Sequence, residues 1–238
     1  RIFMEKMVFE DRKEAGRKLG YVLLKRGYAD QLPLVLGIPR GGLIIAEEVA
    51  QVLAAPMDVI IARKIRAPYQ PELGIGAVVD SDHITIINEK VARSAGATQP
   101  YLEREVAYQR EEIDRRIKFY RGDRSAPDVA GKTVIVVDDG IATGYTFRAA
   151  LEGIRRRNPR GLVAGAPVSA RDSFEMLTAF ADEVVCLQTP DFFMAVGAWY
   201  RNFDQVSDEE AVSILRRNWA RWKSEDRRPK DFGEKKVA

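Results

Sequence analysis

Two adjacent carboxylates, Asp138 and Asp139, follow a short apolar run, residues 133–137. Such a run is typical of a buried parallel strand, and open α/β sheets bind ligands beyond the carboxyl ends of these strands. The following residues, 140–146, include two glycines and two threonines and lead into a predicted helix. Their backbone N–H groups and hydroxyls, at the positive end of the helix dipole, suit a phosphate monoester. We therefore expect a phosphorylated ligand at this strand end.

The acid pair and the loop make opposite electrostatic demands, because carboxylates repel phosphate. The conflict is resolved if Asp138 and Asp139 bind neutral hydroxyls, such as a ribose diol, or a divalent cation, while the loop binds the phosphate. A phosphorylated pentose meets both demands. A complete nucleotide phosphate-binding loop, Gly-x-x-x-x-Gly-Lys-Thr, is absent, as is the Gly-x-Gly-x-x-Gly of a dinucleotide site. A strand and turn with solvated acids is the competing structural interpretation, which the full pattern of 133–146 disfavours.

Composition excludes several other kinds of site. The 238 residues include one histidine, His83, and one cysteine, Cys186. Disulfides, Cys/His zinc sites, His-based triads and two-histidine iron sites are thereby excluded within one chain. We expect His83 to be incidental and Cys186 to belong to the core. The chemistry must then use acids, Lys, Arg, hydroxyls and backbone groups.

The stretch 133–146 resembles the phosphoribosyl diphosphate (PRPP) signature of type I phosphoribosyltransferases. The resemblance implies that Asp138 and Asp139 hold the 2′- and 3′-hydroxyls of the ribose and that the loop holds the 5′-phosphate. The loop residues implied are Gly140, Ala142, Thr143, Gly144, Tyr145 and Thr146. The resemblance also implies Mg²⁺, bound largely through PRPP, with the two acids as candidate metal ligands.

A second match is Pro39-Arg40-Gly41-Gly42, which follows the apolar run 34–38. It is similar to the family's diphosphate loop, which usually contains a strained non-proline cis peptide, here expected between Pro39 and Arg40. Taken alone, this tetrapeptide is equally typical of a tight turn.

A third match is Arg63-Lys64, which resembles the adenine-type branch of the family. There such an arginine contacts diphosphate, and the following loop, here 65–75, closes over the site and excludes water. The resemblance implies that Arg40, Arg63 and Lys64 act with Mg²⁺ to stabilise the charge that grows on the leaving diphosphate. A solvated basic strand end is the competing interpretation.

The sequence leaves the acceptor base open. In the hypoxanthine-guanine branch, an acid stands where this chain has Ala142, and a lysine that reads the 6-oxo group is replaced here by Ser169 and Arg171. These differences argue against a hypoxanthine mechanism without establishing an adenine one. Phe193 aligns with the aromatic residue of the hypoxanthine type and is the expected stacking ring, with Trp199 as a second base-binding candidate. Packing of these rings against the last helix is the competing interpretation.

The elements that must position these residues follow from apolar periodicity and turn signals. Strands are predicted at 34–38, 59–62, 133–137, 162–166 and 184–187, and helices at 11–26, 43–54, 88–95, 101–120, 146–157, 173–180 and 207–220. A proline-containing loop precedes a hairpin of 77–79 and 84–87. Strand–helix–strand units build an α/β fold. We expect a doubly wound, mainly parallel five-stranded sheet flanked by helices, the type I phosphoribosyltransferase fold, with a flexible loop or hairpin and a terminal hood.

We expect one domain, 1–220, with a hood from the N-terminal segment and about 188–206, and then a charged, disordered tail, 221–238. The tail holds seven Lys or Arg and four Asp or Glu, which leaves 31 residues of each sign in the body. A neutral body gives no indication of nucleic-acid binding. No apolar run approaches the roughly 18 residues of a membrane span, and neither a signal segment nor paired cysteines are found, so we expect a cytoplasmic protein.

Three functional hypotheses remain. The first is an enzyme, a pentosyl-type glycosyltransferase that transfers phosphoribose from PRPP to a nucleobase-like nitrogen and releases diphosphate, in purine or related salvage. The second is a PRPP-binding regulator on the same fold without turnover, since fold does not guarantee activity. The third is a salvage-linked interaction protein that has lost activity. The neutral body favours the first. The expected assembly is a homodimer.

Overall fold

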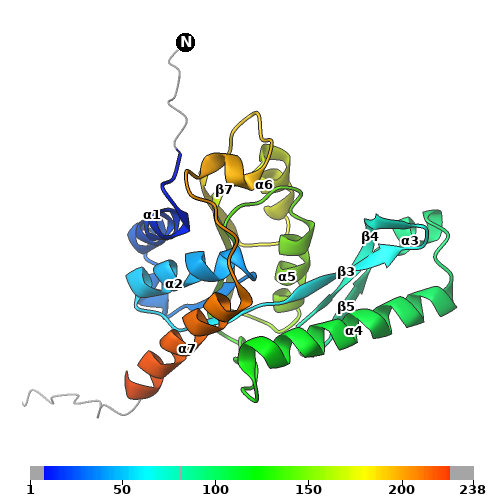
Figure 1. The fold of residues 1–238 in the computed structure, drawn as a ribbon, viewed down its shortest axis with the longest axis horizontal. Coiled ribbons are helices and arrows are strands. Elements are labelled where there is room, and N and C mark those ends of the chain that lie inside the picture. The colour runs from blue at the N-terminus through cyan, green and yellow to red at the C-terminus, as the bar shows by residue number, and fades with distance from the viewer. Residues whose placement is uncertain (1–7, 81, 226–238) are drawn as a thin grey trace, which may run out of the picture.

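The computed structural model describes residues 8–80 and 82–225, and its centre is a sheet of five parallel strands in the order β2-β1-β6-β7-β8 (Figure 1). The strands are β1 (Leu34–Gly37), β2 (Met57–Val59), β6 (Thr133–Val137), β7 (Gly161–Val168) and β8 (Glu183–Gln188). Every residue of β1 and β6 is buried, as expected of strands that are covered on both faces. The predicted five-stranded parallel sheet is confirmed.

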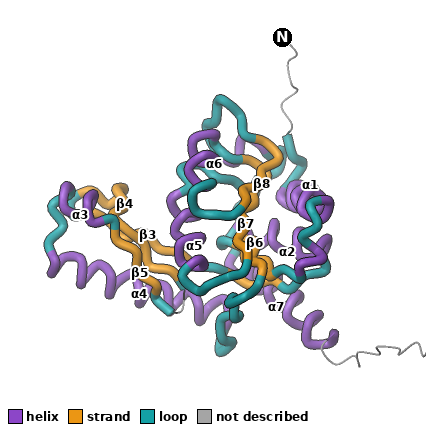
Figure 2. The backbone as a smooth tube through the Cα atoms, turned by 180° about the vertical axis from the view of Figure 1, so that it is seen from behind, coloured by secondary structure: helices purple, strands orange, loops and turns teal. Residues whose placement is uncertain are grey.

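Helices cover both faces of this sheet (Figures 1 and 2). On one face, α1 (Arg12–Lys25), α2 (Gly41–Leu53) and α7 (Asp208–Glu225) pack over a core that includes Val35 and Ile135. On the other face, α5 (Tyr145–Arg155) and α6 (Arg171–Leu177) pack over Leu36 and Val136. Neighbouring strand residues thus point to opposite cores. Within the described residues, no helix is both long and apolar enough to cross a membrane.

An arm extends from the core between β2 and β6 (Figure 1). It consists of a three-stranded antiparallel sheet, β3 (Ala62–Ala67), β4 (Gln70–Val79) and β5 (Ile84–Ile87), followed by α3 (Glu89–Ser94) and α4 (Gln99–Arg121). Helix α4 runs along the arm and brings the chain back to the core. Short 3-10 turns, Ala29–Gln31 and Val196–Trp199, complete the described elements.

The sequence predictions are wrong at the start of the arm. The predicted strand 59–62 is divided between the end of β2 and the start of β3, and the predicted loop 65–75 forms most of a β-hairpin. The hairpin turns at Tyr69, which has a φ of 63°. Pro71 lies within β4 without breaking the sheet, because β5 pairs with β4 only from Gly76 onward.

The last helix begins as predicted and continues further. The Ser207 Oγ atom accepts the N–H of Glu210 at 3.0 Å, which caps the first turn of this helix. The first residues of the predicted tail are helical rather than disordered, because the Trp222 Nε1 atom donates to the carbonyl of Ala55 at 3.1 Å. The remainder of that predicted tail, 226–238, lies outside the described residues.

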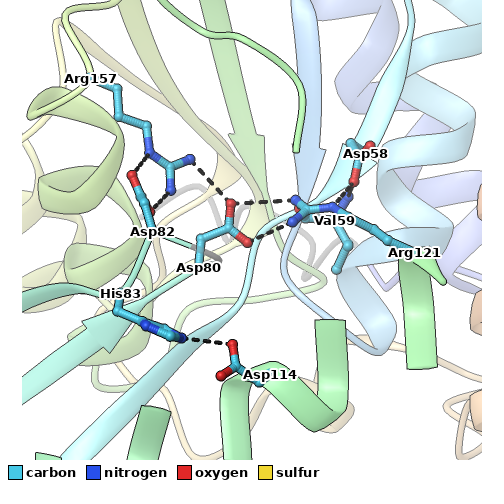
Figure 3. Close-up of polar contacts among 8 residues, drawn as sticks. All are labelled: Asp58, Val59, Asp80, Asp82, His83, Asp114, Arg121 and Arg157. Carbon is cyan, nitrogen blue, oxygen red and sulfur yellow. Dashed lines mark hydrogen bonds and ion pairs between the residues drawn. The ribbon is translucent and has the colours of Figure 1, made fainter. Parts of the chain in front are cut away.

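Arg121, the last residue of α4, anchors the arm to the core (Figure 3). Its guanidinium donates to Asp58 at 2.8 Å, to Asp80 at 2.9 Å and to the carbonyl of Val59 at 2.6 Å. Arg157, which follows α5, donates to the second oxygen of Asp80 at 3.1 Å. The side chains of Arg121 and Asp80 are each 1% exposed. These buried charges compensate one another and join β2, the end of β4 and the segment after α5.

Replacing Arg121 with Met should lower the free energy of unfolding by about 3–5 kcal/mol, because Asp58 and Asp80 would lose their main cationic partner while remaining buried. The control is Arg155→Met, since Arg155 pairs with Asp182 at 2.8 Å where both side chains are about half exposed. That surface pair should contribute less than about 1 kcal/mol. Urea unfolding measures both values, and equal losses would contradict the anchoring role.

Candidate functional site

The acid pair lies at the carboxyl end of β6, the central strand of the parallel sheet. The Asp138 Oδ1 atom accepts the N–H of Asp139 at 2.8 Å. Burial, and then the neighbouring Asp139 carboxylate, raise the pKa of Asp138 well above its ordinary range. The strand end therefore disfavours a second full negative charge, and a ligand that presents hydroxyls or a cation suits it better than a bare phosphate.

Arg12, the first residue of α1, balances the charge of Asp139. Its Nε atom donates to Asp139 Oδ2 at 2.7 Å, and its Nη1 atom donates to the carbonyl of Asp204 at 2.7 Å. The guanidinium lies 3.8 Å from the centre of the Phe203 ring. The sequence analysis missed Arg12, although a signal exists. Arg12 shares the buried face of α1 with Ala15, and a charge on such a face requires a partner.

A second contact to Asp139 comes from the chain near residue 200. The Tyr200 hydroxyl donates to the carbonyl of Asp139 at 2.6 Å. Phe9 forms a parallel bridge with Tyr200, and its N–H donates to the carbonyl of Trp199 at 2.9 Å. Phe9 therefore contacts the residues near Tyr200, and Tyr200 in turn contacts Asp139. The residues predicted for the hood include both Phe9 and the residues near Tyr200.

Two glycines allow the Pro39-Arg40-Gly41-Gly42 turn to reach the acid pair. A Cβ atom added at Gly41 would lie 2.0 Å from Asp139 Oδ2, and one added at Gly42 would lie 2.9 Å from Asp138 Oδ1. Side chains would thus collide with the carboxylates at both positions. The peptide between Pro39 and Arg40 is cis, as the resemblance implied. The first two sequence motifs, far apart in the chain, form one site.

The predicted phosphate loop is held to the fold by hydrogen bonds, while several of its residues are exposed to solvent. The N–H of Ile141 donates to the carbonyl of Val168 at 2.9 Å, and the Ser173 hydroxyl donates to the carbonyl of Ala142. Gly144, with a φ of 73°, is the N-cap of α5, whose first turn has no acidic residue. Ala142, Thr143, Tyr145 and Thr146 are exposed. The helix N-terminus therefore offers N–H donors to an anion from solvent.

Gly140 joins this loop to the segment that carries the aromatic candidates. A Cβ atom added at Gly140 would lie 2.4 Å from a methyl carbon of Val196. Phe193 is half-buried beside the core. Trp199 is 6% exposed within that core, so its ring has little surface left for a base. This burial counts against the predicted stacking role of Trp199, and Phe193 stays the candidate.

The predicted basic pair lies on the arm. The Arg63 Nε atom donates to Gln109 Oε1 of α4 at 3.0 Å, and burial lowers the pKa of Arg63. The Lys64 Nζ atom donates to the carbonyl of Glu72 at 3.0 Å, within the hairpin. Within 8–80 and 82–225, no hydrogen bond or ion pair joins Arg63 or Lys64 to the acid pair. The structure thus assembles two of the three sequence motifs and leaves the third apart.

The donor set suits a divalent cation only with help from a ligand. Among the described residues, no three His, Cys, Asp or Glu side chains cluster as a metal site. One oxygen of Asp138 and one of Asp139 already accept protein hydrogen bonds, which leaves the other oxygen of each. Mg²⁺ is commonly held by one or two carboxylates together with substrate phosphates. Asp138 and Asp139 fit that arrangement.

Comparisons with known proteins point to one family. Residues 10–199 match a family model described as the phosphoribosyl transferase domain. A Mycobacterium tuberculosis H37Rv protein, named "Putative phosphoribosyl transferase", is 38% identical over 227 residues, which are 95% of this chain and 48% of that protein. The chain thus spans about half the length of the curated relatives that it matches over nearly all of its residues.

Two further similarities differ greatly in extent. The crystal structure of TT1426 from Thermus thermophilus is 41% identical, with a TM-score of 0.79, and the match covers 88% of this chain and 98% of that one. The "Bifunctional protein PyrR" of Actinobacillus pleuropneumoniae is 31% identical over 71 residues, which are 29% of this chain and 40% of that protein. Only the first of these similarities extends over most of the fold.

Replacing Asp138 with Asn should stabilise the folded chain. A carboxyl whose pKa is raised on folding stabilises the protein at low pH, and that contribution is lost as the pH rises through the folded value. Asn is uncharged and keeps the acceptor for the Asp139 N–H. At pH 8 we expect the Tm to rise by about 2–4 °C, the effect of about 1 kcal/mol in a domain of this size.

Thermal unfolding with a chelator present, at pH 8 and pH 4, measures this effect. Asp123→Asn, which removes an exposed carboxylate, should leave the Tm nearly unchanged. A gain for Asp138→Asn that is equally large at pH 4, or a lower Tm at pH 8, would show that the buried charge is not the cause.

Proposed function

The chain belongs to the phosphoribosyl transferase domain family, and from this premise we propose that it transfers the 5-phosphoribosyl group of PRPP to a nitrogen of a nucleobase-like acceptor, with release of diphosphate. The observation that carries the proposal is the meeting of Asp138 and Asp139 with Gly41 and Gly42, beside an exposed helix N-terminus. This arrangement offers hydroxyl acceptors and phosphate donors side by side, and a phosphorylated ribose requires both.

Each group of residues has a separate role in the proposal. Asp138 and Asp139 accept hydrogen bonds from the ribose 2′- and 3′-hydroxyls, with Arg12 and Tyr200 holding Asp139 in place. The loop 140–146 binds the 5′-phosphate through its N–H groups and hydroxyls. The turn at Pro39-Arg40-Gly41-Gly42 binds the diphosphate, next to the ribose acids.

The reaction breaks the bond between C1 of the ribose and the diphosphate oxygen, and the bonding electron pair leaves with diphosphate. The acceptor nitrogen bonds to C1 from the opposite face and loses its proton to water. Mg²⁺, bound mainly by diphosphate with Asp138 and Asp139 as protein ligands, would neutralise part of the growing charge. Arg40 stabilises the rest. Because Ala142 offers no acid or base, the proton of the acceptor is not removed by that position.

The acceptor side of the proposal rests on the segment next to Gly140. Phe193, half-buried and close in sequence to Val196, would stack on the base. We favour a purine or related base, in a cytoplasmic salvage reaction. A homodimer remains a prediction from the sequence.

A PRPP-binding regulator without turnover is the second candidate. One observation favours it, namely that Arg63 and Lys64 are engaged on the arm by Gln109 and Glu72. If those contacts persist with PRPP bound, the leaving diphosphate receives less stabilisation than an enzyme needs.

An activity assay distinguishes the two candidates. The protein is incubated with PRPP, Mg²⁺ and a panel of purines, pyrimidines and non-standard bases, and diphosphate release is measured. We expect release that depends on one class of base and that is lost with a chelator and in the double variant Asp138→Asn/Asp139→Asn. PRPP binding without any base-dependent release would refute the enzyme and support the regulator.

Replacing Arg40 with Ala should reduce kcat/KM by about 10²- to 10³-fold, because the turn proposed to bind the leaving diphosphate would lose its positive charge. Arg93→Ala, which removes an exposed arginine from α3, is the matched control and should retain full activity. Steady-state kinetics with varied PRPP provide the measurement. Near-normal turnover of Arg40→Ala would argue that the turn does not bind diphosphate.

A further inference from the structure

A cavity of about 370 Å³ is lined in part by Pro39 and Arg40, which belong to the turn that approaches the ribose acids. Pro39 and Arg40 form one wall, and the last turns of α4, with Arg115, Arg116 and Tyr120, form another. Phe119 and Asp208, the first residue of α7, complete the lining. Figure 1 shows that α7 begins close to the core end of α4. The cavity thus begins at the turn that also contacts the acid pair.

The charged side chains that line this cavity are mainly cationic. Three guanidinium groups, from Arg40, Arg115 and Arg116, face a single carboxylate, that of Asp208. Arg115 is paired with Glu112 along the helix. Arg116 is exposed and has no ion pair among the described residues, and its charge also contributes to the lowered pKa of Arg63. An uncompensated charge of this kind attracts an anion.

The Asp208 carboxylate already lies close enough to Arg40 to attract its guanidinium. The Tyr120 hydroxyl donates to Asp208 Oδ1 at 3.3 Å, and Arg40 Nη1 lies 3.7 Å from the same oxygen. Burial, followed by the Asp208 charge, raises the pKa of Tyr120 to about 12, so its hydroxyl stays protonated and can donate. At 3.7 Å, Arg40 and Asp208 attract each other without forming a good hydrogen bond. A phosphate oxygen could therefore replace Asp208 as the partner of Arg40.

We propose that Arg116, assisted by Arg115, binds the outer phosphate of the diphosphate group, which draws Arg40 away from Asp208. This inference rests on the proposed function and adds α4 to its binding site. The inner phosphate stays next to Gly41 and the ribose acids, and the outer phosphate enters the cavity, where three arginines converge. The arm helix is therefore part of the anion site as well as a support for the hairpin.

The test measures binding of two separate probes by isothermal titration calorimetry. Inorganic diphosphate with Mg²⁺ reports on the cavity, and ribose 5-phosphate reports on the acid pair and the phosphate loop. The variants are Arg116→Gln and Arg115→Gln/Arg116→Gln. Lys118→Gln removes the same charge from the same helix, from an exposed side chain outside the cavity lining, and serves as the control.

We expect Arg116→Gln to weaken diphosphate binding about tenfold, equivalent to about 1.4 kcal/mol, and the double variant to weaken it further. Ribose 5-phosphate affinity should stay within about twofold in both, and Lys118→Gln should resemble the wild type. Asp208→Asn should bind diphosphate several-fold more tightly, because a competing carboxylate is removed. Damage to the fold would weaken diphosphate binding, so it could not explain tighter binding by Asp208→Asn.

Wild-type diphosphate affinity in the double variant would overturn the inference, and so would an equal loss in Lys118→Gln, which would indicate a general charge effect. Wild-type protein that binds ribose 5-phosphate but not diphosphate would refute the inference while leaving the ribose-phosphate site intact. Failure to bind either probe would instead refute the proposed function itself.

Discussion

The structure depends on holding two adjacent carboxylates at the end of one buried strand. Desolvation and mutual repulsion both oppose this arrangement, and the surrounding elements offset that cost. Arg12 supplies a positive charge from α1, and Tyr200 fixes the backbone of Asp139. Glycines let the neighbouring turn approach without a collision. The site is therefore built before a ligand arrives, at some expense in stability, as is common where function requires strained or charged groups.

A second set of buried charges serves a different purpose. Arg121 and Arg157 contact Asp58 and Asp80 from segments that are distant in the sequence, and they fix the arm where the chain leaves and rejoins the core. Around Asp139, one oxygen remains free for a ligand, whereas Arg121 is almost completely enclosed. The fold thus separates an ionic network that holds elements together from an acid pair that is only partly enclosed.

The sequence was most informative where a pattern is local and continuous. The apolar run 133–137 identified the central strand, because a buried parallel strand has a distinctive composition, and the acids that follow it predicted a candidate site at its end. The hairpin of the arm was mistaken for a loop, because residues 70–74 are exposed and carry no alternating apolar pattern. Pro71 reinforced that error.

Contacts between distant segments were not predictable in the same way. Arg12 and Asp139 are 127 positions apart, and only the fold brings them to 2.7 Å. Trp199 was a base-binding candidate by type, but it is 6% exposed within the core. The arginines of α4 belonged to a heavily charged helix, in which no local feature distinguishes those that face the Pro39–Arg40 turn from those that face solvent.

The attachment of α4 at its last residue has a mechanical consequence. A helix of 23 residues is about 35 Å long, and Arg116 lies about 7.5 Å from Arg121 along it. If the arm pivots at Arg121, Arg116 moves only about a quarter as far as Gln99 at the other end. Large movements of the hairpin tip would then produce only small displacements of Arg116 beside Arg40.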